Sequence, residues 1–521
     1  MRVGKNPDSW RWPAWIAIAI AGIGVAGATS LLLRVREAEA RASEGRKLAL
    51  AMVAPQASDG DVVAKVRAYV ATQGGSPEAR ELASIYRALA ARETELRTAL
   101  ADLERAMQLY NRPGPLWAGR DLDIAEVNLR TGETKTALGD TAGAMAAFNA
   151  AIESAAKSGA GDIAARRVTA AAHERLAARY RHAYDMRRAS EHAQQAISIY
   201  EAMPADAAAR QALMNSFVTQ AGILSRQNRL YEAHDLYIRV LDERMQAAAE
   251  HPDSVAALTD LALAHSGVGQ ILGGTIMSMG EDDAAVRQYR EAIAIAERLA
   301  KENPQSAAAE SLLAQQLSAC GGAMRKPALA GESLRMLERA AEIHKRLLAA
   351  DPGNVNHVFY LTATLGDIGA RLAPAKKWKA AVESLLEAQG AIEKVLASDP
   401  ANRTPKLLWL DVMHKLAPAM ARAGDAAGAI RAAARGLEVA REQGALDSEV
   451  FRTRIEIPLS LNTVAETYAA LGRMDEAVEA ARKAVAEWAR VRSLGTLPRG
   501  VAAEAEMATA LSAPRTAAGV R

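Results

Sequence analysis

Residues 348–354 read Leu-Ala-Ala-Asp-Pro-Gly-Asn, and this short stretch decides how the chain is divided. A near copy, Leu-Ala-Ser-Asp-Pro-Ala-Asn, returns at 396–402, so that Pro352 and Pro400 lie 48 residues apart. The same signal stands upstream at steps of 48 and 52 residues, at Pro304 and Pro252. Proline lacks an amide hydrogen and disfavours a helical conformation in the residue before it. The spacing therefore predicts helix ends at a nearly constant period, as in a repeat architecture.

The composition favours an all-α chain that binds no nucleic acid. Half of the 521 residues are apolar but only 4% are aromatic, and alanine, the strongest helix former, is abundant. The 64 basic and 61 acidic residues give a net charge of +3 without a basic block, so the electrostatic pattern of a nucleic-acid-binding protein is missing. The single cysteine, Cys320, excludes an internal disulfide, and we expect it to be a small buried side chain.

An uncharged stretch near the N-terminus predicts a membrane anchor. Residues 15–33 carry no charge and are long enough to span a bilayer, and three tryptophans stand at one end, where interfacial rings are favoured. A cleaved signal peptide is the alternative, but the apolar run continues past the small-residue box Ala26-Gly27-Ala28. Gly24 and Ala28 would allow two spans to pack as a dimer. Charge counting alone would put the large domain in the cytoplasm, but long domains are translocated largely regardless of charge, so the orientation stays open.

Between the prolines, each unit reads as two amphipathic helices. In 461–485, apolar residues at i, i+3, i+4 and i+7 define one helix face, and a second stripe follows Gly472. The pattern resembles the tetratricopeptide repeat, whose signature positions fall on Leu461, Val464, Ala465, Tyr468, Gly472, Ala477, Ala481 and Ala484. A second frame, offset by 48 residues, runs from Met413 to Gly436, with Pro418 inside its first helix. Second-helix matches start at Gly139 and Gly280.

The units are longer than the usual repeat of about 34 residues, so longer helices or loops must absorb the excess. Residues 269–280 look like one such insertion. The resemblance implies a right-handed α-solenoid of about eight TPR-like helix pairs, preceded by one transmembrane helix. The predicted organisation is a tail at 1–14, a transmembrane helix at 15–33, a membrane-proximal helical region at 34–118, a repeat array at 119–492 and a capping helix with a flexible tail at 493–521.

A narrower resemblance concerns the order of these parts. The Arg/Glu-rich stretch 33–41, the Leu-Gly-Asp-Thr-Ala-Gly-Ala motif at 138–144 and the Ala-Asp-Pro-Gly-Asn motif at 350–354 are similar to the C-terminal half of receptor-type serine/threonine kinases of the acidobacterial kind. In those kinases the catalytic domain precedes the span, whereas only 14 residues precede it here. The resemblance implies a bacterial inner-membrane protein, single-pass, with an extracytoplasmic (periplasmic) repeat domain and no kinase activity.

The motifs of common active sites are missing from the sequence. It holds no P-loop, no Gly-x-Ser-x-Gly and no kinase signature. His173-Glu174 begins the nearest approach to a zinc motif, but an alanine stands where the second histidine should be. We expect His182 and His192 to be helix-surface residues rather than metal ligands. The predictions are therefore no enzyme, no catalytic residues, no metal and no cofactor.

Function must then reside in a surface, and the first helices of the pairs should line a concave groove. Placing the repeat frame on the sequence puts five polar residues there as candidates for binding an extended peptide or protein: Asn215, Arg226, His414, Arg422 and Asn462. Arginine and asparagine could hold a peptide backbone or carboxylate, or merely solvate the groove. The sequence thus predicts a non-catalytic, membrane-anchored interaction scaffold or signalling sensor module.

Two rival functions stay open at this point. The first is the sensor region of a serine/threonine kinase signalling system, as a kinase remnant or a partner subunit. The second is an enzyme whose site lies in the insertion around 271–280. A capping helix is expected near 501–511. The identity of the ligand and the biological process are not encoded in any motif of the chain.

Overall fold

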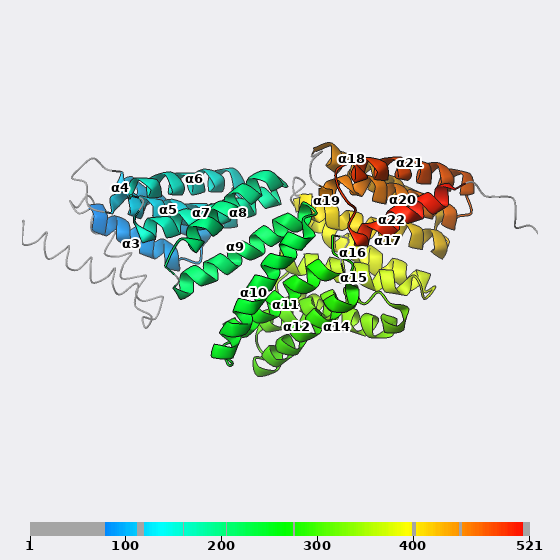
Figure 1. Cartoon of the computed structure of the whole chain (residues 1–521), viewed down its shortest axis with the longest axis horizontal. Helices are drawn as coiled ribbons and strands as arrows, with labels where there is room; N and C mark the ends of the chain where they lie inside the picture. The colour runs from blue at the N-terminus through cyan, green and yellow to red at the C-terminus, as the bar shows by residue number, and fades with distance from the viewer. Residues whose placement is uncertain are drawn as a thin grey trace, which may run out of the picture. The chain divides into compact units, whose positions relative to one another are not determined.

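The computed structural model describes residues 79–111, 119–159, 161–204, 206–274, 277–398, 403–446 and 451–513. In these ranges the chain is helical and contains no strand. The helices follow in chain order (Figure 1): α3 (Ala79–Arg92), α4 (Leu96–Tyr110), α5 (Arg120–Ala137), α6 (Thr141–Lys157), α7 (Ile163–His182), α8 (Met186–Glu201), α9 (Ala207–Arg226), α10 (Leu230–Glu250), α11 (Val255–Leu272), α12 (Asp282–Glu302), α13 (Ala307–Ala323), η1 (Pro327–Leu329), α14 (Ala330–Ala350), α15 (Val355–Leu372), α16 (Trp378–Ser398), α17 (Arg403–Ala423), α18 (Ala426–Leu446), α19 (Phe451–Arg454), α20 (Glu456–Ala470), α21 (Met474–Arg492) and α22 (Arg499–Ser512).

The proline signals end helices as predicted. Pro252, Pro304 and Pro352 each stand in a four-residue connection, between α10 and α11, α12 and α13, and α14 and α15. Two residues after each proline comes the N-cap of the next helix, a serine or asparagine whose side chain accepts a hydrogen bond from a first-turn amide: Ser254, Ser306 and Asn354. The repeated motif therefore both ends one helix and caps the N-terminus of the next. Pro400 lies outside the described residues.

Residues 1–78 also lie outside the described residues. The predictions for the N-terminal tail, the transmembrane helix and its dimer contact fall on them. Among the described helices one, α11, is long and apolar enough to cross a membrane by length and composition. Its apolar residues Leu258, Val268 and Ile271 are buried in the core that α11 shares with α10 and α12. In the solenoid α11 is thus a core helix.

The described chain falls into two compact units, and the division lies within α7. The first unit, up to Ala172, contains α3 to α6. Tyr110 and Leu103 of α4 are buried against Val127 of α5, and Arg87 forms ion pairs with Asp123 at 3.2 Å and with Glu126. The second unit, from His173, holds the helix pairs that form the site described below.

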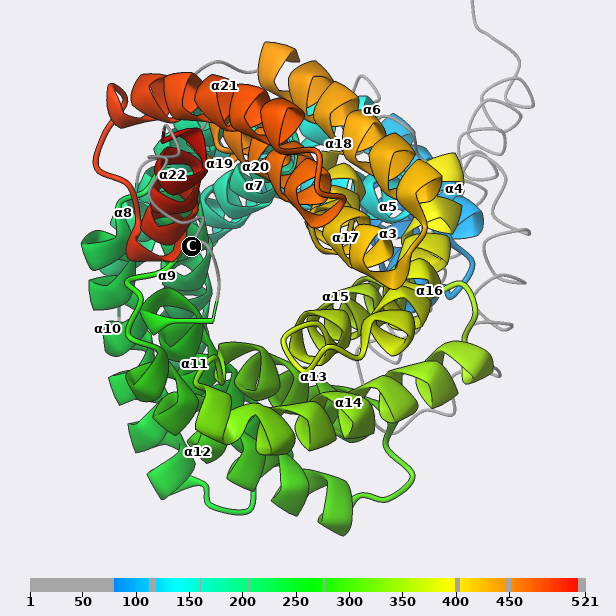
Figure 2. The ribbon, with the colours of Figure 1, turned by 90° about the vertical axis from the view of Figure 1, so that its right-hand side faces the viewer.

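Within the second unit the helices alternate between an inner and an outer position. Figure 2 shows the first helices of successive pairs, α11, α13, α15 and α17, facing inward, and the second helices α12, α14, α16 and α18 outside them. This is the expected consequence of stacking helix pairs whose apolar stripes can be buried only against a partner and the next pair. The first helices are therefore the ones that face a common interior.

The two helices of a pair fit by complementary size. A glycine on the first helix is followed 16 positions later by the large side chain that packs on it: Gly132 and Phe148, Gly321 and Leu337, and Gly369 and Leu385. A Cβ atom on Gly369 would lie 2.5 Å from Cγ of Leu385. In these pairs a large side chain on the second helix thus fills the space that the glycine leaves.

The α11–α12 pair departs from this spacing, since Gly269 meets Tyr289 twenty positions later. The insertion responsible follows α11 and is tied to that helix by backbone hydrogen bonds from Met279 to Ile271 and from Glu281 to Leu272. Its Met277 is buried in the C-terminal core together with Trp488 and Val501. The insertion that the sequence predicted at residues 269–280 therefore connects α11 to the C-terminal core of this unit.

Candidate functional site

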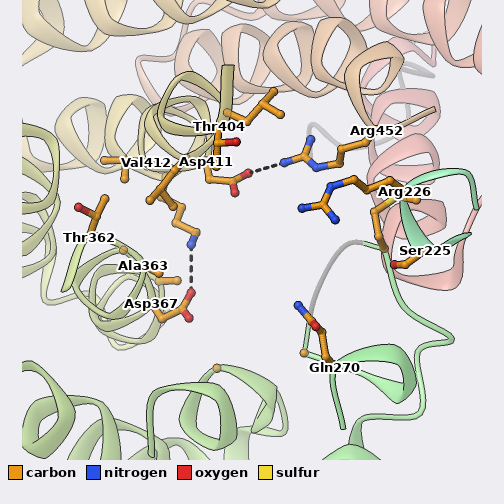
Figure 3. A pocket seen from close by; sticks show the side chains of 18 of the residues that line it. Ser225, Arg226, Gln270, Thr362, Ala363, Asp367, Thr404, Asp411, Val412 and Arg452 are labelled. Atoms are coloured by element: carbon orange, nitrogen blue, oxygen red, sulfur yellow. Dashed lines mark hydrogen bonds and ion pairs between the residues drawn. The ribbon is translucent and has the colours of Figure 1, made fainter. Parts of the chain in front are cut away.

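A cavity of about 720 Å³ lies in the interior of the second unit. Its lining residues come from the inner helices α9, α11, α13, α15 and α17, from the α11–α12 connection, and from α19 and α22 (Figure 3). The volume falls in the range typical of ligand pockets. The cavity is thus lined mainly by first helices, which are the helices that the sequence predicted to line a concave groove.

Small residues of α15 form one wall of the cavity, here called the low wall because its short side chains project little into the space. Ala363, Gly366 and Ala370 recur at helical spacing and all line the cavity, because residues three or four apart share a helix face. Leu407 and Leu408 of α17 add apolar surface to the same space. A chain segment could therefore lie against α15 without meeting large side chains.

Two ion pairs join four of the charged groups that line the cavity. Lys415 Nζ of α17 lies 3.0 Å from Asp367 Oδ1 of α15, and Arg452 Nη2 lies 3.5 Å from Asp411 Oδ1; both pairs are drawn in Figure 3. Arg452 also pairs with the fully buried Glu456. Burial would lower the pKa of Lys415, but Asp367 and Asp411 raise it above its usual value. These pairs fasten the inner helices to one another.

Arg371 is satisfied by uncharged acceptors. Its Nε donates to Ser333 Oγ at 2.9 Å, and its Nη2 donates to the carbonyls of Gly322 at 2.8 Å and Gly321 at 3.3 Å. These carbonyls lie in the last turn of α13, where a cation is favoured. Arg371 therefore caps α13 rather than offering its guanidinium to a ligand.

Arg226 of α9 differs from the other cavity cations. Figure 3 shows its side chain pointing into the cavity. The contact that its guanidinium makes among the described residues is a hydrogen bond from Nη1 to the carbonyl of Gly222, at 3.0 Å, one turn earlier on the same helix. Arg226 thus faces the cavity with most of its five N–H donors available.

A second cavity of about 460 Å³ adjoins the first and shares Ala370, Asp411, Lys415 and Glu504 with it. Three predicted residues, His414, Arg422 and Asn462, line this smaller cavity. Each is engaged within the protein. His414 Nε2 lies 2.9 Å from Ser460 Oγ, Asn462 Nδ2 donates to the Glu504 carbonyl at 2.8 Å, and the Arg422 guanidinium lies 5.4 Å from the Trp378 ring centroid.

The structure does not bring the five predicted residues into one place. Arg226 lines the larger cavity, and three others line the smaller one. Asn215 is exposed on α9, and its Oδ1 accepts a hydrogen bond from Arg244 of α10 at 3.5 Å. Sequence reasoning missed Asp367 and Lys415. Their separation of 48 residues equals the proline period, and this was the signal that could have paired them.

The histidines form no metal site in the described residues, where no group of three potential ligands occurs. His192 pairs with His173 instead, with their Nδ1 atoms 2.8 Å apart, and stacks on Tyr180 at a centroid distance of 5.3 Å. Burial lowers the pKa of His173 to about 4. Cys320 is fully buried, as the sequence predicts, and burial raises the pKa of its thiol to about 11.

Several solved structures are similar to this chain, although at low identity. The Rap conjugation gene regulator of plasmid pLS20, in complex with the Phr* peptide, is 13% identical, with 81% of this chain and 97% of that chain covered at a TM-score of 0.39. The apo quorum sensor NprR from B. thuringiensis is 11% identical, covering 76% and 99% at 0.39. A STAND protein with a tetratricopeptide repeat sensor from Pyrococcus horikoshii is 12% identical, covering 72% and 51% at 0.37.

A search of curated proteins gives no match. The model of the tetratricopeptide repeat family matches residues 459–493, which hold most of α20 and all of α21. This is the segment whose spacing predicted the repeat from the sequence, with Ala465 and Ala481 fully buried at the signature positions. The pair α20–α21 thus matches the tetratricopeptide repeat model, in a chain whose described part consists mainly of successive helix pairs.

Proposed function

We propose that this protein is a non-catalytic binding protein that takes an extended peptide, or an extended segment of a protein, into the 720 Å³ cavity of its second unit. The observation that carries the proposal is the combination of a low wall on α15 with an arginine, Arg226, that points into the cavity. Apolar walls with a few fixed polar groups are typical of ligand pockets. An extended peptide would supply carbonyl and carboxylate acceptors for such an arginine.

The proposal predicts that filling the cavity weakens peptide binding. Ala363→Phe would place a ring against the low wall of α15. We expect it to weaken binding of peptides from a random eight-residue library to the full chain in detergent by at least tenfold, a loss of about 1.4 kcal/mol or more. Fluorescence anisotropy of the selected peptides measures this loss.

The matched control is Ala380→Phe, because Ala380 is exposed on the outer helix α16. This variant adds the same ring outside the cavity and should bind as tightly as the unmodified chain. Equal binding by both variants, with both folded by circular dichroism, would place the peptide elsewhere and contradict the proposed function.

We further propose that residues 15–33 anchor the protein in a bacterial inner membrane with the repeats outside the cytoplasm. The support is the uncharged 15–33 stretch itself. A C-terminal alkaline phosphatase fusion should be active in a bacterial host, and a C-terminal green fluorescent protein fusion should be dark. A fluorescent fusion without phosphatase activity would reverse the proposed orientation.

A further inference from the structure

Two arginines stand together beside the cavity, and neither forms an ion pair with a carboxylate among the described residues. Arg226 lies on α9, and Arg181 lies in the last turn of α7. A Cβ atom on Gly222 would lie 3.2 Å from Arg181 Nη1 and 3.8 Å from Arg226 Nη1, so both guanidinium groups reach the same glycine. The missing side chain of Gly222 makes room for both.

Of the other cations of the cavity, Arg371 donates to uncharged acceptors and three lie close to carboxylates. Lys415 and Arg452 are paired with carboxylates, as described above. Arg325 lies 3.9 Å from Asp282. The acidic side chains of the cavity are engaged too, since the Glu504 carboxylate accepts a hydrogen bond from Asn462 at 3.3 Å. Neither Arg181 nor Arg226 forms an ion pair among the described residues, although the carboxylates of Asp367, Asp411 and Glu504 line the same cavity.

Holding two like charges together in a partly buried place is unfavourable without an anion. Burial lowers the pKa of Arg181, and the adjacent Arg226 charge lowers it further. Tyr237 also lines the cavity. Burial raises the pKa of its hydroxyl, and the positive charges of Arg181 and Arg226 partly offset this increase. An anion between the guanidinium groups and the cavity would relieve this repulsion.

We infer that Arg181 and Arg226 form the anion site of the cavity and bind a carboxylate of the peptide, so that Arg226 contacts the ligand directly and Arg181 adds its charge from behind Gly222. This inference rests on the proposed function and names the chemical class of its ligand. Arginine presents parallel N–H groups that match the two oxygens of a carboxylate. The carboxylate can be the C-terminus of the peptide or an aspartate or glutamate side chain.

The first test measures stability without ligand. Arg226→Gln removes one of two repelling charges and keeps a polar side chain. Its melting temperature should be unchanged or up to about 3 °C higher than that of the unmodified full chain. A purely structural arginine would instead lower the melting temperature when replaced. The control is Arg339→Gln, because Arg339 lies on the outer helix α14 and is paired with Glu297 at 2.7 Å.

The second test measures peptide binding. Arg226→Gln should weaken binding of the selected peptides by about 10- to 100-fold, the range expected for charge-assisted hydrogen bonds. Arg339→Gln should bind them as tightly as the unmodified chain. Amidated peptides and peptides without aspartate or glutamate then identify which carboxylate is bound. Unchanged binding by Arg226→Gln, or by peptides lacking every carboxylate, would overturn the inference. Arg181→Gln serves as the second variant if Arg226→Gln does not fold.

A third test separates this inference from the proposed function. Sodium acetate should raise the melting temperature of the unmodified chain by a few degrees relative to sodium chloride at equal ionic strength, through preferential binding to the folded state. The shift should vanish in Arg226→Gln. An acetate shift without any peptide binding would support the anion site and refute the proposed peptide-binding function. Peptide binding with no acetate shift and no effect of Arg226→Gln would support the proposed function and refute the anion site.

Discussion

Leu385→Ala is expected to destabilise the second unit by about 2–5 kcal/mol, because it removes a large side chain that is buried against Gly369 and leaves a cavity. Gly369→Ala alone should destabilise by about 1–2 kcal/mol, since its new methyl group meets Cγ of Leu385 at 2.5 Å and overpacking outweighs the gain in helix propensity. In the double variant the new methyl occupies part of the vacated space. The double variant should therefore lose less free energy of unfolding than the two single variants together, by about 1 kcal/mol or more, which is the size of coupling seen between contacting residues.

Urea unfolding monitored by circular dichroism checks this cycle. Gly390→Ala is the matched control, because Gly390 lies on the outer helix α16 and a Cβ there meets nothing within 4 Å. It should stabilise by about 0.5–1 kcal/mol through helix propensity alone. Strict additivity of Gly369→Ala and Leu385→Ala would contradict the size-complementary packing described for the helix pairs.

Acid is expected to destabilise the second unit through the buried histidine His344. Its side chain is fully buried on α14, and neither ring nitrogen has a hydrogen-bond partner among the described residues. Burial, assisted by the nearby His357, lowers the pKa of His344 to about 4 from an ordinary value of 6.5. Between these two values the unfolded chain binds more protons than the folded chain, so stability falls as the pH is lowered from about 6.5 to about 4. The loss for this one group is about 2–3 kcal/mol.

His344→Phe isolates the contribution of this histidine. The ring of His344 stacks on Tyr360 at a centroid distance of 5.5 Å, so phenylalanine preserves an aromatic contact and removes the titration. Unfolding midpoints measured from pH 7.5 to pH 4 should depend less on pH in this variant than in the unmodified chain. Parallel pH profiles for the two proteins would show that His344 is not the group that charges on unfolding.

The helix ends were the most predictable part of the fold, because their causes are local. A proline followed two residues later by serine or asparagine carries both the stop and the next N-cap, as at Pro304 and Ser306. Gly472 follows α20 with a φ of +75°, a left-handed conformation that glycine adopts without strain. Pro418 shows the limit of such reasoning. This proline does not end a helix, because α17 runs from Arg403 to Ala423 with Pro418 buried inside it.

The candidate site was less predictable, because its character depends on contacts between units of the repeat. The frame predicted that first helices line a common groove and assigned Arg226 to it, and Arg226 does line the larger cavity. It could not show that Asn462 is held by Glu504 of the final helix or that Arg181 lies beside Arg226. Such pairs arise from the angle between successive helix pairs, which the apolar pattern of a single pair does not specify.

Hydrogen exchange of the full chain, with and without the tightest peptide from the random library, tests the central claim most directly. Binding in the cavity should slow exchange in the inner helices α9, α15 and α17, which supply Arg226, Ala363 and Leu408. The outer helices α12, α14 and α16 should exchange as in the free protein. Protection confined to the outer helices, with none in α15 and α17, would contradict the account.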